Sequence, residues 1–154
     1  MAITQAMCTS FKQELLQGIH NFTNGSGGGT TTSTGTGNAF KLALYTAGSG
    51  APYSTASTVY TSGTANQVGT SGTGYSTGGN TLTSQAVASS TAVASVDFAD
   101  TEWTSATFTA AYGVIYNSST VDSTADRLVV VLDFGGNKTC TNGTFKITYP
   151  DPAT

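Results

Sequence analysis

The spacing of apolar residues changes from four to two along this chain, which divides it into a helical start and a β-rich remainder. Apolar residues recur at every fourth position from Ile3 to Ile19, so they fall on one face of a helix. Two N-terminal caps fit this pattern. Thr4 would begin a long helix, and Ser10, three residues before Gln13, would form a capping box for a shorter one. The sequence therefore predicts one short N-terminal α-helix.

This helix has a wider apolar face than an isolated surface helix tolerates, so we expect it to dock on another surface. Gly18 and Asn21 supply stop signals after it. Residues 24–38 are almost wholly Gly, Ser and Thr, a composition typical of a flexible tether or a long loop. A tethered helix can pack on its own domain or reach a neighbouring subunit, and both alternatives stay open. The residues expected to make either contact are Met7, Phe11, Leu15, Leu16 and Ile19.

From residue 39 onward, apolar and polar residues alternate in short runs separated by turns rich in Gly, Asn and Asp, which predicts strands. The predicted strands are 39–46, 58–61, 81–88, 92–98, 103–117, 127–134 and 144–149. Both faces of 127–134 are apolar, which indicates a central strand covered on both sides. Seven to eight strands at this spacing predict a mainly β protein with a single β-sandwich or jelly-roll-like domain. The predicted organisation is a helical arm over 1–23, a linker over 24–38 and the β domain over 39–154.

Composition and charge exclude several kinds of partner. Only 8% of the 154 residues are charged, against about 25% in an ordinary soluble domain. The net charge is −3 with five Lys and Arg residues, which argues against binding to nucleic acid or to a membrane surface. No apolar run approaches the roughly 20 residues of a membrane span. Lys12 and Glu14 interrupt the N-terminal apolar pattern, which argues against a signal peptide.

Residues that could carry catalysis or hold a metal are scarce. His20 is the only histidine and stands at the predicted helix end, where a cation is favoured by the helix dipole. Asp97, Asp100 and Glu102 form the densest acidic cluster, but their spacing matches neither a calcium loop nor a catalytic motif and suits a turn. The glycine runs do not open a helix after a strand, as phosphate-binding loops do. The sequence therefore predicts no enzyme, no metal site and no cofactor.

Aromatic residues and cysteines leave two further alternatives open. Trp103, Tyr112 and Tyr116 could form a surface platform that binds sugars, although packing in the core or at its rim is the favoured interpretation. Cys8 and Cys140 could form a disulfide, although buried thiols are the more usual state in a protein made in the cytosol.

Three segments in this order resemble a family of small virion proteins of tailed bacteriophages. They are MAITQAMCTSFKQELLQGIHNF at the start, FKLALYT at 40–46, and VDFADTEWTSATFTAAYGVIYN at 96–117 followed by RLVVVLDFGG at 127–136. The glycine-rich turn GTGYSTGGNTL at 72–82 also fits the family. The insert at 25–37 departs from the short turn expected there.

The resemblance implies a non-enzymatic structural protein of a virion, made in the cytoplasm of the host bacterium. The leading hypothesis is a capsid decoration or cement subunit that forms homo-oligomers and binds the major capsid protein. The alternatives are a tail, neck or fibre protein that contacts portal or tail proteins, and a glycan-binding module for attachment to a host. The resemblance implies no catalytic residues.

Overall fold

The computed structural model describes residues 5–23, 37–48 and 52–150 and confirms the mainly β, sandwich-like fold with one short helix. Most of the predicted linker at 24–38 lies outside the described residues, as does Thr4. No helix in the described ranges has the length and hydropathy needed to cross a membrane. The elements in chain order are β1 (Ala6–Met7), α1 (Thr9–Leu16), β2 (Phe40–Tyr45), β3 (Asn80–Thr81), β4 (Ala86–Ser90), β5 (Val93–Asp97), β6 (Thr101–Asn117) and β7 (Arg127–Ile147).

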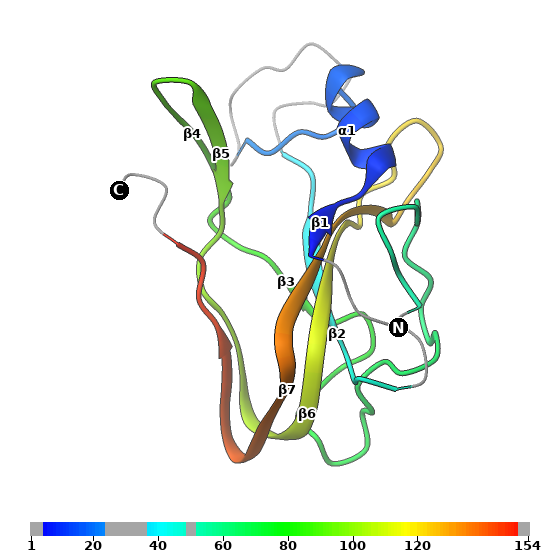
Figure 1. The fold of residues 1–154 in the computed structure, drawn as a ribbon, viewed down its shortest axis with the longest axis vertical. Coiled ribbons are helices and arrows are strands. Elements are labelled where there is room, and N and C mark those ends of the chain that lie inside the picture. The colour runs from blue at the N-terminus through cyan, green and yellow to red at the C-terminus, as the bar shows by residue number, and fades with distance from the viewer. Residues whose placement is uncertain (1–4, 24–36, 49–51, 151–154) are drawn as a thin grey trace.

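All pairing is antiparallel, in a five-stranded sheet of order β1-β7-β6-β2-β3 and a separate two-stranded sheet of β4 and β5. The predicted strands 127–134 and 144–149 are one strand, β7, which pairs with β6 along most of its length. The predicted strand 81–88 is instead divided between β3 and β4, and 58–61 contributes only an isolated bridge from Val59 to Arg127. In Figure 1, the paired strands β6 and β7 run side by side to the bottom of the view. The pair bends there and continues upwards on the side of the C-terminus.

The β6–β7 hairpin bends partway along its length, where the pairing of its two strands is irregular. Tyr112 pairs with Asp133 and Ala110 with Lys138, so residues 134–137 lie opposite Ala111 alone. Gly135 and Gly136 stand inside this bulge with φ of 68° and 123°, a region that side chains rarely adopt. Extra residues in one strand bend and twist that strand away from its partner. The two halves of one hairpin therefore form opposing walls.

The upper half of this hairpin and β2 have two apolar faces. Alternation and register place Tyr45, Tyr112 and Val131 on one face, where Tyr45 stacks on Tyr112 with ring centroids 5.2 Å apart. The loops after β2 cover this face, since Tyr53 and Tyr60 are buried against it. The opposite face, which includes Ile115 and Leu132, lies on the inner side of the bent hairpin.

The prediction that 127–134 is a central strand covered on both sides holds only in part. Leu128 and Val131 are fully covered, whereas Val130 and Leu132 are half-buried. β1 pairs with β7 only at Val130 and Val131, and the segment 58–59 adds a bridge to Arg127 and a hydrogen bond from Leu128, so β7 has neighbours on its outer edge only near its start.

Helix α1 is the shorter of the two predicted helices, but it does not use the predicted caps. Residues Ala6–Met7 form a strand, and Cys8 is the N-cap without a side-chain hydrogen bond. Neighbouring backbone satisfies the donors there, since Cys8 N–H donates to the Val129 carbonyl (2.9 Å) and Thr9 N–H to that of Thr55 (2.8 Å). The Ser10 hydroxyl is buried without a partner among the described residues. Within the predicted arm over 1–23, residues 6–16 are thus joined to the β domain by a strand, a helix and hydrogen bonds.

We expect the tight turn before β3 to depend on Gly79. Its φ is +73°, and a Cβ atom there would stand 1.8 Å from the Leu42 carbonyl oxygen of β2. Gly63 has a similar φ of +70° with no atom within 4 Å of the same position, which makes it a matched control. Gly63→Ala should cost only the left-handed strain of about 1–2 kcal/mol. Gly79→Ala should cost at least about 2 kcal/mol more, because backbone has to move. Urea unfolding of the two variants measures the difference, and equal losses would contradict the close packing.

Candidate functional site

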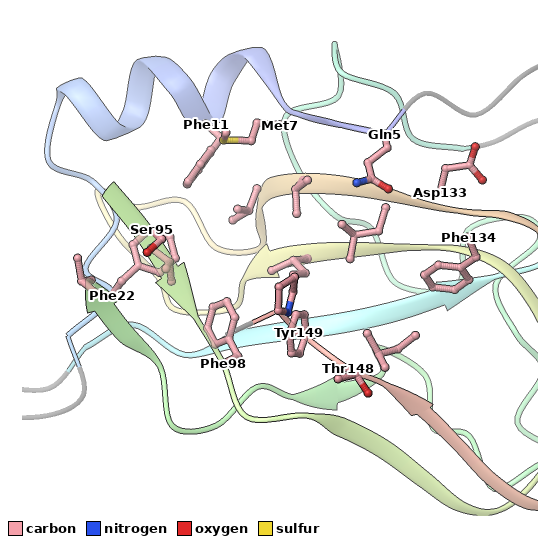
Figure 2. Close-up of a pocket in the computed structure, with 18 of the residues that line it drawn as sticks. Gln5, Met7, Phe11, Phe22, Ser95, Phe98, Asp133, Phe134, Thr148 and Tyr149 are labelled. Atoms are coloured by element: carbon pink, nitrogen blue, oxygen red, sulfur yellow. The ribbon is translucent and has the colours of Figure 1, made fainter. Parts of the chain in front are cut away.

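An open apolar groove lies inside the bend of the β6–β7 hairpin. Its volume is about 1120 Å³. One wall is the sheet face with Ile115, Val130 and Leu132, and the other is the C-terminal half of β7, with Phe145 and Ile147. Figure 2 shows α1 above the groove and the side chains of Phe98, Phe134 and Tyr149 directed into it.

Aromatic rings line much of the groove. Phe98 lies 6.0 Å from Tyr149 and Phe134 lies 6.5 Å from Phe145, measured between ring centroids. At the other end Phe22 contacts Phe98 in an edge-on arrangement at 6.5 Å. Burial raises the pKa of Tyr149 to about 12, so its hydroxyl stays neutral under ordinary conditions. The groove thus offers rigid, uncharged contact surfaces.

The β4–β5 hairpin forms one rim of the groove and is exposed over most of its surface. Val87 and Val96 are cross-strand partners that line the groove, and they are 59% and 40% exposed. Val93, which is 66% exposed, is not part of the lining. An isolated two-stranded hairpin is marginally stable in water, so a partner that covered this rim would stabilise it.

Charged groups are few at the groove. Lys146 makes an ion pair with Asp100 (Nζ to Oδ2, 2.8 Å), which lowers the pKa of Asp100 and raises that of Lys146. Both side chains are solvent-accessible, so the pair contributes little to stability. Lys138 and Asp133 also line the groove. Of the acidic cluster predicted as a turn, Asp97 and Glu102 lie in β5 and β6, and only Asp100 lies in the connection between them. No group of metal-ligating residues occurs in the described ranges.

A buried polar cluster lies behind the groove, where α1 meets the ends of β6 and β7. Glu14 binds Arg127 (Oε1 to Nη1, 2.6 Å) and His20 (Oε2 to Nε2, 2.8 Å). The second ring nitrogen of His20 lies 3.0 Å from the Asn117 amide nitrogen, which also donates to Asn38 Oδ1 at 3.0 Å. The His20 side chain is 0% exposed, so this cluster offers no access to a substrate.

The five residues predicted as helix contacts differ in burial and in the surface that they contact. Phe11 is buried in the core, with its ring centroid 4.9 Å from that of His20. Met7 and Leu15 line the groove and are 50% and 44% exposed, whereas Leu16 is 91% exposed. Ile19, the fifth, is half-buried just after the helix. The helix docks through Phe11 and Glu14 rather than through its whole apolar face.

The three aromatic residues considered as a sugar platform do not form an exposed surface. Trp103, Tyr112 and Tyr116 are 2%, 1% and 3% exposed. Tyr116 stacks on Tyr60 at 4.1 Å between ring centroids and donates to the Gly78 carbonyl at 2.9 Å. The platform interpretation is wrong, because these side chains fill the core between the sheet and its covering loops.

Cys8 and Cys140 are both free thiols, and Cys8 is fully buried. Burial, with a smaller effect of the nearby Glu14 carboxylate, raises the pKa of the Cys8 thiol. Cys140 is half-buried in the lower part of β7.

Sequence reasoning missed both the groove and the buried polar cluster. The patterns at 81–88 and 92–98 predicted strands there but not which side they would expose. Glu14, read as an interruption of the apolar pattern, is instead the buried centre of the ion pairs. No local pattern signals such a cluster, since Glu14 and Arg127 are 113 positions apart.

Comparison of the chain with protein-family models, with curated proteins and with solved structures gives no match.

The two faces of α1 give a test of how the helix docks. Phe11→Ala removes a buried ring and should cost about 3–5 kcal/mol of unfolding free energy. Leu16→Ala, on the same helix, should change it by less than about 0.5 kcal/mol, because that side chain is in solvent. Chemical denaturation of both variants measures this. A large loss from Leu16→Ala would instead show that its side chain is covered in solution.

Proposed function

We propose that this protein is a non-enzymatic structural subunit of a bacteriophage particle, and that its open groove binds another protein of that particle. The observation that carries the proposal is the groove itself, a large apolar concavity left open beside an exposed hairpin. Exposed apolar patches of this kind mark interaction sites on soluble proteins.

The chemistry of the groove favours a protein over a small polar ligand. The cores of protein interfaces are enriched in aromatic residues and poor in charge, as is the surface formed by Phe98, Phe134 and Tyr149. The polar groups at the rim are mostly charges in solvent rather than a convergent set of donors and acceptors that would orient a small molecule.

The outer edge of β7 suits an extended peptide. Beyond Val131 no strand of the described residues pairs with this edge, which continues to Ile147. An unpaired strand edge can accept an added strand from a partner, with side chains of that strand entering a neighbouring groove. A segment of a capsid protein, or of a second copy of this chain in a homo-oligomer, could bind in this way.

Within the particle, we propose capsid decoration as the position, with the tail, neck or fibre as the alternative. A chain with few charges and one exposed hairpin suits a subunit that buries one side on a repeating lattice. The resemblance of the sequence to small virion proteins supports membership of a particle in either position.

Stoichiometry distinguishes the two positions. Mass spectrometry of dissociated, purified particles should find this protein in a copy number comparable to that of the major capsid protein. A ratio of only a few per cent would place it in the neck, tail or fibre. Absence from the particles would contradict the structural role itself.

A matched pair of variants tests the groove as the docking surface. Val96→Lys places a charge in the groove, whereas Val93→Lys places one on the same hairpin outside the groove lining. Both positions are exposed, so neither variant should lose much stability. Incorporation into particles should fall at least about tenfold for Val96→Lys, because burying an unpaired charge costs more than about 1.4 kcal/mol. It should be unchanged for Val93→Lys, and equal incorporation of both would exclude the groove.

A further inference from the structure

The buried polar cluster determines which nitrogen of His20 carries the proton. Two backbone N–H groups, which can only donate, establish the orientation of the two neighbouring amides. Ser119 N–H donates to Asn117 Oδ1 (3.1 Å), and Asn21 N–H donates to Asn38 Oδ1 (2.7 Å). Asn117 must therefore present its NH₂ group to His20 and to Asn38 Oδ1, at 3.0 Å each.

His20 Nδ1 is thus an acceptor, so it carries no hydrogen. Its Nε2 lies 2.8 Å from Glu14 Oε2, a carboxylate oxygen that needs a donor, and therefore holds the ring proton. This is the neutral imidazole with the proton on Nε2. A second proton on Nδ1 would point at the Asn117 NH₂ group, and two donors would then face each other.

The charged groups that face His20 are Glu14 of α1 and Arg127 of β7. Among the described residues, the rings of Phe40 of β2 and of Phe22 after α1 also lie near it, at 6.3 and 6.1 Å between centroids. Glu14 favours a charged imidazole, but Arg127 already neutralises Glu14. Burial outweighs the attraction and lowers the pKa of His20 below its ordinary value.

The ring also joins elements that are distant in sequence. Through Glu14 it is bound to α1 and, one step further, to Arg127 at the start of β7. Through Asn117 it is bound to the end of β6. Phe11 of α1 packs on the ring itself at 4.9 Å. One neutral histidine therefore contributes to the docking of α1 on the sheet, beside the direct ion pair of Glu14 with Arg127.

We propose that His20 is an acid-sensitive latch, and that its protonation releases α1 and the segment around it from the sheet. The docked state excludes the second proton, whereas the released state exposes the ring to water and accepts it. The proposal goes beyond the structural role, since it concerns how the N-terminal segment is held and not what the groove binds.

The direction of the pH dependence follows from this difference. The released state binds the extra proton with an ordinary pKa of about 6.5, and the docked state has a lower pKa. Docking is therefore fully stable above that value and weakens as the pH falls below it. Because His20 is the only histidine, no other side chain of ordinary pKa titrates between about pH 5.5 and 7.5.

Nitrogen NMR of the unmodified protein tests the starting point without any variant. With a single histidine, the two ring nitrogens are identified without further assignment. At neutral pH the spectra should show a neutral ring protonated on Nε2, and this signal should persist in the docked state below about pH 6.5. A ring protonated on both nitrogens, or on Nδ1 alone, in the folded protein would overturn the proposal.

The reactivity of the Cys8 thiol measures the release of α1 from the sheet. Cys8 is 0% exposed at the N-cap of α1, whereas Cys140 is half-buried in β7 and serves as an internal reference. The ratio of Cys8 to Cys140 labelling by an aromatic disulfide reagent that reacts at acidic pH should rise about tenfold between about pH 7.5 and 5.5. Far-ultraviolet circular dichroism should show the β structure retained. A labelling ratio that stays constant with pH would contradict the proposal. Loss of the whole fold at the pH where Cys8 becomes reactive would contradict it as well.

Asn117→Asp replaces the hydrogen-bond donor that faces His20 Nδ1 with an acceptor. A carboxylate there can accept a hydrogen bond from a protonated Nδ1, so the docked state tolerates the charged ring and the rise in Cys8 labelling should disappear. His20→Gln removes the titrating group and should also give a ratio that does not depend on pH in this window. Persistence of the rise in either folded variant would overturn the proposal. If neither variant folds, the NMR and labelling of the unmodified protein decide it.

Discussion

The pairing of β6 with β7 is the interaction on which the rest of the molecule depends. These two strands contact each other along most of their length, and every other element of the main sheet attaches to one of them or to β2 beside them. Because four residues of β7 face one of β6 at the bulge, the hairpin bends rather than continuing flat. The bend turns one hairpin into two walls and leaves the groove between them.

Each face of the upper hairpin is completed in a different way. The tyrosine-rich face is closed by loops of the same chain, through aromatic stacks and hydroxyl contacts. The opposite face is covered in part by α1, the segment around Phe22 and Phe98. Where that covering ends, apolar surface remains accessible in the groove. The same sheet thus provides a stable core on one side and an interaction surface on the other.

The covering of the second face rests on a polar contact as well as on hydrophobic packing. Glu14, Arg127 and His20 are buried together, and removing any one would leave a partner without its charge or hydrogen bond. Such a cluster adds specificity to docking, because α1 must be correctly placed for Glu14 to reach both Arg127 and His20. It also makes docking sensitive to the protonation state of one ring, which apolar packing alone would not.

The sequence by itself determined the mainly β class, the short helix near the N-terminus and most strand positions, because a period of two or four is a local property of consecutive residues. It also showed a chain with few charges and a single histidine. Tertiary structure decided that 127–134 and 144–149 belong to one bent strand, that Trp103 is in the core, and that α1 buries Glu14. These outcomes depend on partners such as Arg127 that are far away in sequence, and no local pattern encodes which distant residues will meet.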